Sequence, residues 1–249
     1  MLRARPIHFT SRPHQWTELL EALGMVNTVK DDEWLEFDAG SGRLALHRVE
    51  HTPAMSGAPQ DGVTIFGVEV GALEEFARRT QDDGTIAEVT EASHGQTVQI
   101  TARDGFTFLA DPAQRAGDGT WATSDKADPA LAVVATWVSP GVDDSAQELR
   151  NIGARPRTSD DESATFTAKN GGILRVVHGA AAESGDLAFE YDADLEPLLR
   201  RLTGAGIEAR ISEDVLYIAN PDAAGGSAPA SIVVERTPVE RASGERPQA

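Results

Sequence analysis

The sequence predicts an α+β protein built from four copies of one unit, in which a strand is followed by a helix and then by three strands. The four units begin near Ile7, Gly62, Leu131 and Asp186. Short alternating stretches mark the strands, and apolar residues at helical spacing mark the helices. The third unit also aligns with the first, because Glu-Ala-Leu-Gly ending at Gly24 matches Arg-Asn-Ile-Gly ending at Gly153. A repeat of this kind constrains the architecture more than any single residue does.

The first unit shows the pattern most clearly. Residues 5–10, Arg-Pro-Ile-His-Phe-Thr, alternate as a strand does. Residues 14–24 form a helix that ends at a glycine, and its apolar face carries Trp16, Leu19, Leu20 and Leu23. Three strands are then expected at residues 25–30, 33–38 and 43–50.

The other units repeat this order. In the second unit we expect a strand at 63–70, a helix at 73–83, and strands at 87–93, 97–102 and 106–110. In the third, the corresponding ranges are 131–138, 143–152, 154–158, 164–169 and 173–178. In the fourth, they are 187–192, 195–202, 208–212, 216–220 and 231–235. Two domains of two units each are therefore expected at 1–112 and 130–237, with a linker at 113–129 and a flexible tail at 238–249.

Composition excludes several classes of function. The chain has 40 acidic and 22 basic residues, and its formal charge of -18 would repel nucleic acid and an anionic membrane surface. No apolar run approaches the roughly 20 residues of a membrane-spanning helix, and a strand expected almost at Met1 leaves no room for a signal peptide. There is no cysteine, and so no disulfide or thiolate site. We therefore expect a cytoplasmic protein with a small-molecule ligand.

Five segments carry a resemblance to a known superfamily. They are residues 8–24, Trp-Leu-Glu-Phe-Asp-Ala-Gly from Trp34, Arg-Leu-Ala-Leu-His from Arg43, Gly-Val-Glu-Val from Gly67, and Trp-Val-Ser-Pro from Trp137. In this order they resemble the vicinal oxygen chelate superfamily, which includes glyoxalase I, ring-cleaving dioxygenases and bleomycin-resistance proteins. The resemblance implies two glyoxalase-like domains. Each would have a curved mixed sheet with helices on its convex face and a ligand pocket on its concave face.

Strand alternation sorts the side chains of the first half between these two faces. The helix-facing side is expected to hold the apolar residues Ile7, Phe9, Leu35, Phe37, Leu44, Leu46, Val98, Ile100, Phe106 and Phe108. The concave side then holds a polar and aromatic set whose ligand-binding candidates are His8, Trp34, Glu36, Arg43, His47 and Gln99. Such a mixed surface suits a small-molecule pocket, and it is also typical of a sheet face that is exposed to solvent and binds nothing.

In the second half, the same sorting places an apolar set against the helices, namely Val134, Phe166, Leu174, Val176, Leu187, Phe189, Leu216, Ile218, Ile232 and Val234. The concave candidates are Trp137, Arg175, Glu190, Tyr217 and Glu235. An indole, a phenol, a guanidinium and two carboxylates would suit a polar or cationic aromatic ligand. Trp137 is equally suited to packing under a loop or against the other domain.

The resemblance also implies where a metal would bind. Enzymatic members of the superfamily hold a divalent ion with His, Gln or Glu side chains from the first and last strands of each unit. In the first half, His8 matches the first-strand position and His47 lies at or next to the fourth-strand position. The two remaining positions fall on Val63 and Leu109, which cannot bind a metal.

The second half departs further from this pattern. Its first-strand position is Trp137, so that Glu235 and His178 are the donors left. A catalytic ion needs three or four convergent ligands. We therefore expect no metal cofactor, and His8 with His47 is the pair to test for a divalent metal.

Two functions from different classes fit these observations. The first is metal-independent binding of a small aromatic or cationic molecule, as the resemblance to bleomycin-resistance proteins implies. The alternative is a divalent-metal-dependent glyoxalase-like lyase or isomerase, or a dioxygenase-like enzyme, with Glu36 as a proton-transfer base. A third interpretation is a scaffold whose pockets are filled by side chains. We expect a monomer whose halves pair as a pseudo-dimer, or a weak homodimer.

Overall fold

The structure of the chain, a computed structural model, describes residues 1–49, 60–92, 95–116, 119–225 and 228–237. In these residues, four α-helices are each preceded by a strand and followed by three strands, which confirms the predicted α+β class. The helices are α1 (Pro13–Leu23), α2 (Leu73–Asp82), α3 (Val142–Asn151) and α4 (Leu195–Gly204). None of these described helices is long and apolar enough to cross a membrane. The tail expected at 238–249 lies outside the described residues.

Helix α1 illustrates how the sequence sets these boundaries. Pro13 occupies the first turn, where its missing N–H costs no hydrogen bond, and all four apolar residues of the predicted face are buried. Gly24 follows the helix with a φ of 95°, a left-handed conformation that side chains disfavour. A Cβ at Gly24 would also lie 2.6 Å from the Cβ of Asp128. Backbone conformation and close packing therefore both require glycine at this position.

The first two units form two five-stranded sheets, ordered β1-β7-β10-β9-β8 and β3-β4-β5-β2-β6. Their strands are β1 (Leu2–Ala4), β2 (Ile7–Thr10), β3 (Val26–Lys30), β4 (Trp34–Asp38), β5 (Arg43–Arg48), β6 (Thr64–Ile65), β7 (Gly67–Val70), β8 (Ile86–Ala92), β9 (Gly95–Thr101) and β10 (Thr107–Pro112). The two sheets are parts of one interrupted sheet. Leu2 pairs with Val70 and His8 pairs with Thr64, and both pairs belong to one continuous antiparallel register. The break contains Pro6, which has no N–H to donate.

The last two units form one nine-stranded mixed sheet, ordered β12-β13-β14-β11-β16-β19-β18-β17, with β15 beside β11. Its strands are β11 (Leu131–Ser139), β12 (Arg155–Ser159), β13 (Ser163–Thr167), β14 (Ile173–His178), β15 (Glu183–Ser184), β16 (Ala188–Tyr191), β17 (Ala209–Ser212), β18 (Val215–Ala219) and β19 (Ser231–Arg236). Strand β11 is parallel to β14, and β16 is parallel to β19. Strand β11 occupies the same place in the third unit that β1 and β2 together occupy in the first, but it has no break.

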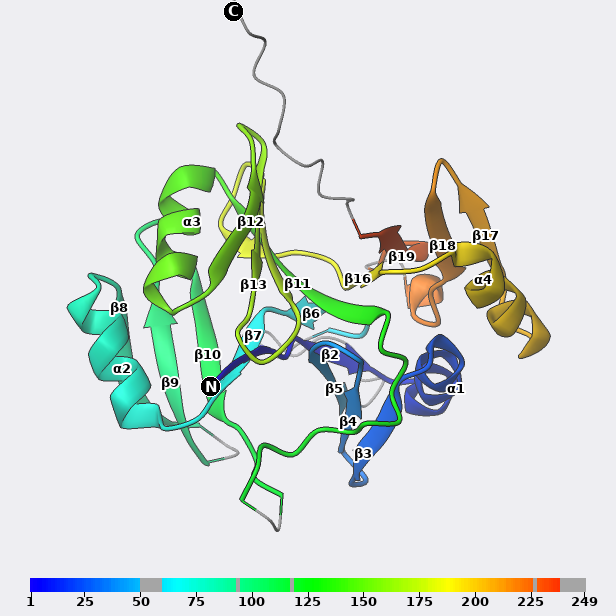
Figure 1. Cartoon of the computed structure of the whole chain (residues 1–249), viewed down its shortest axis with the longest axis horizontal. Helices are drawn as coiled ribbons and strands as arrows, with labels where there is room; N and C mark the ends of the chain where they lie inside the picture. Colours follow the sequence, from blue (N-terminus) through cyan, green and yellow to red (C-terminus); the bar gives the residue numbers. More distant parts are fainter. Residues whose placement is uncertain (50–59, 93–94, 117–118, 226–227, 238–249) are drawn as a thin grey trace, which may run out of the picture.

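The helices lie on two opposite sides of the molecule, with α2 and α3 on one side and α1 and α4 on the other (Figure 1). Two buried cores follow this arrangement. One combines α2 and α3 with β1 and strands of the second and third units, and the other combines α1 and α4 with strands of the first and fourth units and the start of β11. Each core therefore draws on both halves of the chain. The predicted division into domains around 113–129 stays a prediction.

The first strand of each half faces the opposite way from the prediction. His8 in β2 packs against α1, with its ring centroid 4.2 Å from that of Trp16. Trp137 in β11 is fully buried and stacks on Phe106, with ring centroids 4.8 Å apart, in the core that contains α2 and α3. Both side chains therefore face the helices, and the prediction that they line a concave face is wrong.

The corresponding apolar residues face the concave side. Phe9 lies beside His47, with ring centroids 5.2 Å apart, and Ile7 shares its side of β2. Val134 forms a small apolar cluster with Ile173 and Ala188. In β11 the wrong prediction has a simple cause. Both faces of this strand are apolar, so the sequence Leu-Ala-Val-Val-Ala-Thr-Trp-Val does not show which side chains face the helices.

In β2, a buried carboxylate from the fourth unit, Asp222, determines which side chains face the helices. It accepts hydrogen bonds from His8 Nε2 at 2.9 Å, Trp16 Nε1 at 2.7 Å and Thr10 Oγ1 at 2.9 Å, and it pairs with Arg12 at 3.1 Å. Burial alone would raise the pKa of Asp222, but the hydrogen bonds from His8, Trp16 and Thr10 hold that pKa below its usual value. The Asp222 side chain therefore links the fourth unit to the first strand and helix of the first unit.

Replacing Asp222 by asparagine is expected to lower the free energy of unfolding by about 3 kcal/mol, because buried donors lose a charged acceptor. A carboxyl group with a lowered folded-state pKa stabilises the fold above its ordinary pKa, and this contribution is lost as the pH falls through the folded-state value. Urea unfolding should therefore show a difference between wild type and Asp222→Asn that is large at about pH 7 and smaller at about pH 3.

The matched control is Asp32→Asn, which makes the same change on an exposed turn. Its free energy of unfolding should stay within about 0.5 kcal/mol of wild type. Equal losses in the two variants, or a loss in Asp222→Asn that does not depend on pH, would contradict this account of the fold.

Candidate functional site

The concave side of the first two units is filled by buried charges. We call them the arginine–carboxylate cluster, and its members are Arg3, Arg5, Arg43, Glu36, Asp38, Glu69 and Asp111. Each member is at most 5% exposed. Charges are tolerated at such depth only when they are paired and hydrogen-bonded. The predicted binding residues Glu36 and Arg43 therefore hold other side chains of the cluster in place of a ligand.

Arg43 lies at the centre of the arginine–carboxylate cluster. Its guanidinium is 2.6 Å from Asp38, 2.9 Å from Glu36 and 3.3 Å from Glu69. Burial alone would lower the pKa of Arg43, but the hydrogen bond to Asp38 and the charges of Glu69, Asp38 and Glu36 raise it. Arg5 adds a second pair to Glu36 at 3.0 Å. The guanidinium of Arg43 is thus permanently charged and fully engaged.

A stretch of the expected linker covers this cluster. The carbonyl oxygen of Ala122 accepts hydrogen bonds from Arg3 Nη1 and Arg43 Nη2, both at 3.0 Å. The backbone N–H of Ser124 donates to Asp38 at 2.7 Å. The concave face of the first half is therefore closed from outside as well as filled from within.

The remaining first-half candidates do not converge on one site. Trp34 Nε1 donates to Glu36 at 3.1 Å, and its ring meets His47 edge-on with centroids 5.7 Å apart. His47 Nδ1 lies 3.0 Å from the carbonyl oxygen of Arg48. Gln99 is exposed on β9. Trp34 is thus bonded to the arginine–carboxylate cluster, whereas His47 is bonded to the backbone and Gln99 is exposed.

His8 and His47, the pair considered for a metal, lie on opposite faces of their sheet. His8 is 2% exposed, and its ring nitrogens are 2.9 Å from Thr64 Oγ1 and 2.9 Å from Asp222. His47 is on the concave side, next to Phe9. Because the sheet separates the two imidazoles, they cannot bind one ion together, and the prediction that they form a pair is wrong.

The concave face of the second half is open. A cavity of about 440 Å³ is lined by residues of β11, β14, β15, β16 and β19, and we call it the concave groove. Its volume falls in the range of roughly 300–1,000 Å³ that small-molecule sites occupy. Val138, Val177 and Val233 give it aliphatic surface. Arg175 and Glu235, two of the predicted binding residues, are part of its lining.

Arg175 connects two predicted acids, Glu235 in the lining of the groove and Glu190 next to it. Its guanidinium pairs with Glu235, with Nη1 at 3.3 Å, and Nη2 is 3.6 Å from Glu190. Glu190 is buried and pairs with Arg157 at 2.9 Å. Among the described lining residues, Arg175 is the one cationic side chain. The carboxylates next to it therefore neutralise the positive charge of the groove.

Two further acids of the groove, Glu183 and Asp186, were missed by sequence reasoning. Both are exposed, and neither has an ion pair within the part of the chain that the structure describes. Gly185, between them, packs closely on β11, since a Cβ there would lie 2.7 Å from Thr136 Cγ2. The sequence offered one signal for these two acids, which is that they lie just before the first strand of the fourth unit.

The two aromatic candidates do not line the groove. The guanidinium of Arg210 covers the ring of Tyr217, 4.5 Å from its centroid. Trp137 is buried in the core, and its Nε1 has no hydrogen-bond partner among the described residues. The described lining therefore contains no aromatic side chain.

The donors in the groove do not fit a divalent metal ion. Among the described residues, no group of three or more His, Cys, Asp or Glu side chains is placed to hold one. The polar side chains on the first and last strands of these units include Arg175, Glu190 and Glu235, and both carboxylates are paired with arginines. A guanidinium between two carboxylates takes the position that a cation would need.

Comparisons with known proteins find matches among solved structures, whereas no family model and no curated protein matches the chain. A 2,3-dioxygenase from Pseudomonas sp. KL28 has a TM-score of 0.56 at 12% identity, and the match covers 94% of this chain and 91% of that one. A halotolerant catechol dioxygenase has a TM-score of 0.53 at 12% identity, covering 94% and 85%. Homoprotocatechuate 2,3-dioxygenase from Brevibacterium fuscum has a TM-score of 0.57 at 14% identity, covering 93% and 78%.

These comparisons correct one expectation and leave another untested. The matched proteins are extradiol dioxygenases, which use iron or another divalent metal, and this contradicts the expectation of no cofactor. The glyoxalase-like or bleomycin-resistance-like subtype stays a prediction, because the matched structures are dioxygenases. At these identities the similarity establishes the fold and not the activity. The chain has the vicinal oxygen chelate fold of the extradiol dioxygenases.

Proposed function

We propose that the concave groove binds a small organic cation. The observation that carries this proposal is the pair Glu183 and Asp186, which line the groove, are exposed, and have no ion pair among the described residues. The other two charges of the lining, Arg175 and Glu235, neutralise each other. The groove therefore presents uncompensated negative charge beside an aliphatic surface.

Charge and shape both favour a cation of modest size. Carboxylates in a concave surface raise the local concentration of cations, and the chain's charge of -18 strengthens this field. Val138, Val177 and Val233 provide apolar contact for a carbon body. The sequence suggested an aromatic or cationic ligand, with Trp137 stacking on it. Since Trp137 is in the core, recognition in this proposal depends on ion pairing and aliphatic contact.

A second candidate function is metal-dependent chemistry on a small substrate, and the similarity to catechol dioxygenases favours it. It would require Arg175 to release Glu235, the carboxylate on the last strand of its unit, so that Glu235 could serve as a metal ligand. The argument is an analogy between folds. The two candidates differ in one measurable respect, which is the requirement for a divalent metal.

The assembly expected from the sequence, a monomer acting as a pseudo-dimer or a weak homodimer, stays a prediction. Both buried cores already combine elements from the two halves of one chain, which supports internal pairing. Light scattering across a range of protein concentrations measures the assembly directly.

Removing the two free carboxylates together, as Glu183→Gln with Asp186→Asn, is expected to weaken binding of agmatine about tenfold in isothermal titration calorimetry. The affinity of the wild type should also fall as ionic strength rises from about 0.01 M to about 0.15 M, because the Debye length shortens from about 30 Å to about 8 Å. Succinate, a dianion of similar size, should not bind in the groove.

Glu88→Gln is the matched control, since Glu88 is exposed on β8, outside the groove, and the change removes the same charge. Its affinity for agmatine should equal that of the wild type. The proposal fails if wild type shows no binding of agmatine, or if the double variant and the control bind it equally well.

The second candidate predicts about one divalent metal per chain in protein purified without chelators, measured by mass spectrometry of the metal content. It further predicts that Glu235→Gln reduces this content, since a ligand is lost, while Glu88→Gln leaves it unchanged. Protein that carries no metal and takes up none from added iron, manganese, nickel or zinc would reject this candidate.

A further inference from the structure

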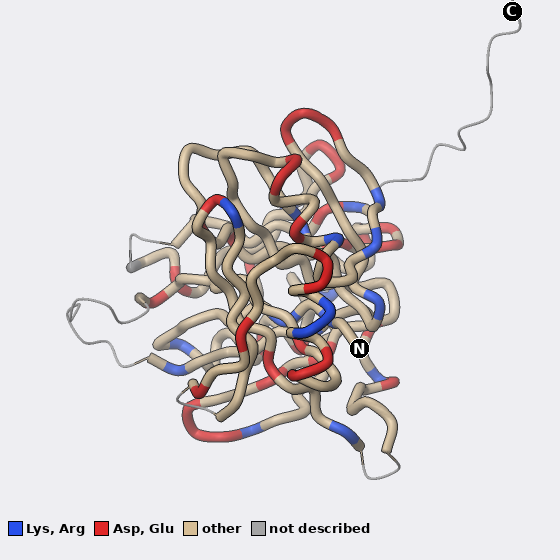
Figure 2. The backbone as a smooth tube through the Cα atoms, turned by 90° about the vertical axis from the view of Figure 1, so that its left-hand side faces the viewer, with Lys and Arg blue, Asp and Glu red and all other residues tan. Residues whose placement is uncertain are grey.

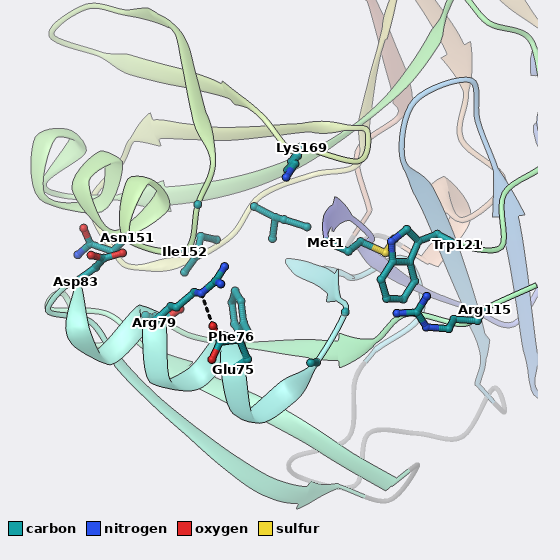
Figure 3. Close-up of a pocket in the computed structure, with 15 residues that line it drawn as sticks. Met1, Glu75, Phe76, Arg79, Asp83, Arg115, Trp121, Asn151, Ile152 and Lys169 are labelled. Carbon is teal, nitrogen blue, oxygen red and sulfur yellow. Dashed lines mark ion pairs between the residues drawn. The ribbon is translucent and has the colours of Figure 1, made fainter. Parts of the chain in front are cut away.

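A second cavity, of about 500 Å³, lies where α2, the end of α3 and the turn between β13 and β14 meet (Figure 3). It shares no lining residue with the concave groove. The turn is fixed beside β1, because Asn170 N–H donates to the carbonyl of Leu2 at 2.7 Å and Asn170 Oδ1 accepts from Leu2 N–H at 3.1 Å. Elements from both halves of the chain therefore form the walls of this cavity.

Three cationic side chains line this cavity, Arg79, Arg115 and Lys169. They do so in a chain with 40 acidic and 22 basic residues, and Figure 2 shows how the positions of the two kinds alternate on this side of the molecule. Arg79 pairs with Glu75 at 2.6 Å, whereas Arg115 and Lys169 have no carboxylate partner in the described part of the chain. Burial and the positive charges of Lys169, Arg79 and Arg115 lower the pKa of the Met1 amino group. The positive charges of all three side chains therefore reach the same part of the cavity, next to the Met1 amino group.

The acids of the lining do not cancel this charge. Glu75 is engaged with Arg79, and Asp83 lies just after the end of α2. In the close-up, Asp83 is at one end of the cavity and Arg115 is at the other, with Lys169 above the middle (Figure 3). The part of the cavity nearest Arg115 and Lys169 is therefore electropositive.

Apolar side chains complete the wall, chiefly Phe76, Ile152 and Trp121. The indole of Trp121 is held in place, because the guanidinium of Arg115 lies 4.0 Å from its ring centroid. A Cβ on Gly71 would lie 3.0 Å from two of its ring atoms, so that glycine leaves the space that the indole needs. The cation at this end is thus oriented before any ligand arrives.

We propose that this cavity is a second binding site, for a small carboxylate with an apolar body. The carboxylate group lies in the part of the cavity lined by Lys169 and Arg115, whose positive charges have no carboxylate partner among the described residues and attract it. The apolar body lies against Phe76 and Ile152, which an inorganic anion would not use. The volume is in the range of small-molecule sites. The groove and this cavity thus take ligands of opposite charge.

The test measures binding of octanoate and benzoate to the whole chain by calorimetry, with acetate and inorganic phosphate as anions without an apolar body. Wild type is expected to bind octanoate or benzoate at least about tenfold more tightly than acetate or phosphate. Lys169→Gln and Arg115→Gln should each weaken this binding about tenfold. Thermal unfolding of each variant without ligand checks that it has folded.

Lys30→Gln is the matched control, because Lys30 is exposed on β3, outside the cavity, and the change removes the same charge. It should bind octanoate as the wild type does, and so should the groove variant Glu183→Gln with Asp186→Asn. The proposal is overturned if folded wild type binds neither octanoate nor benzoate, if phosphate binds as tightly as they do, or if Lys169→Gln and Arg115→Gln bind them unchanged.

Discussion

Burial of Arg3, Arg5 and Arg43 among four carboxylates decides which of the two concave faces of this molecule can hold a ligand. Removing so many charges from water is unfavourable unless every one finds partners inside the protein. In the arginine–carboxylate cluster, the partners come from both sheets of the first half and from the segment that closes over it. These side chains cannot turn toward a ligand without leaving another charge alone. The second half carries fewer such pairs, and there the curved sheet keeps an open groove.

The four-unit pattern and the four helices could be predicted from the sequence because their periodicity is local, as the apolar face of α1 illustrates. The orientation of the first strands could not. In β11, both faces are apolar, and in β2 the burial of His8 and Thr10 depends on Asp222, more than two hundred residues later. Arg175, Glu190 and Glu235 were predicted together because regular strands carry them. Glu183 and Asp186 were not, because β15 is only two residues long and Asp186 lies in the connection after it, so that neither shows an alternating pattern.

The shared fold extends over nearly the whole chain, yet the groove differs in chemistry from what a metal site needs. Identities of 12–15% preserve the arrangement of strands and helices and say little about the side chains on the concave face. Here arginines pair with the carboxylates of that face. The shared fold thus includes the curved sheet, while the ion pairs on its concave face are an observation on this chain alone.

The pairing of α1 with α4 has a consequence for how the chain is made. The first unit is synthesised before the fourth, but the core over the apolar face of its helix also needs residues of the third and fourth units. Until the fourth unit has been synthesised, Trp16 and its neighbours lack the part of their core that α4 supplies, and a long loop must then be closed to cover them. The first unit therefore completes its core only after a contact between segments nearly two hundred residues apart has formed.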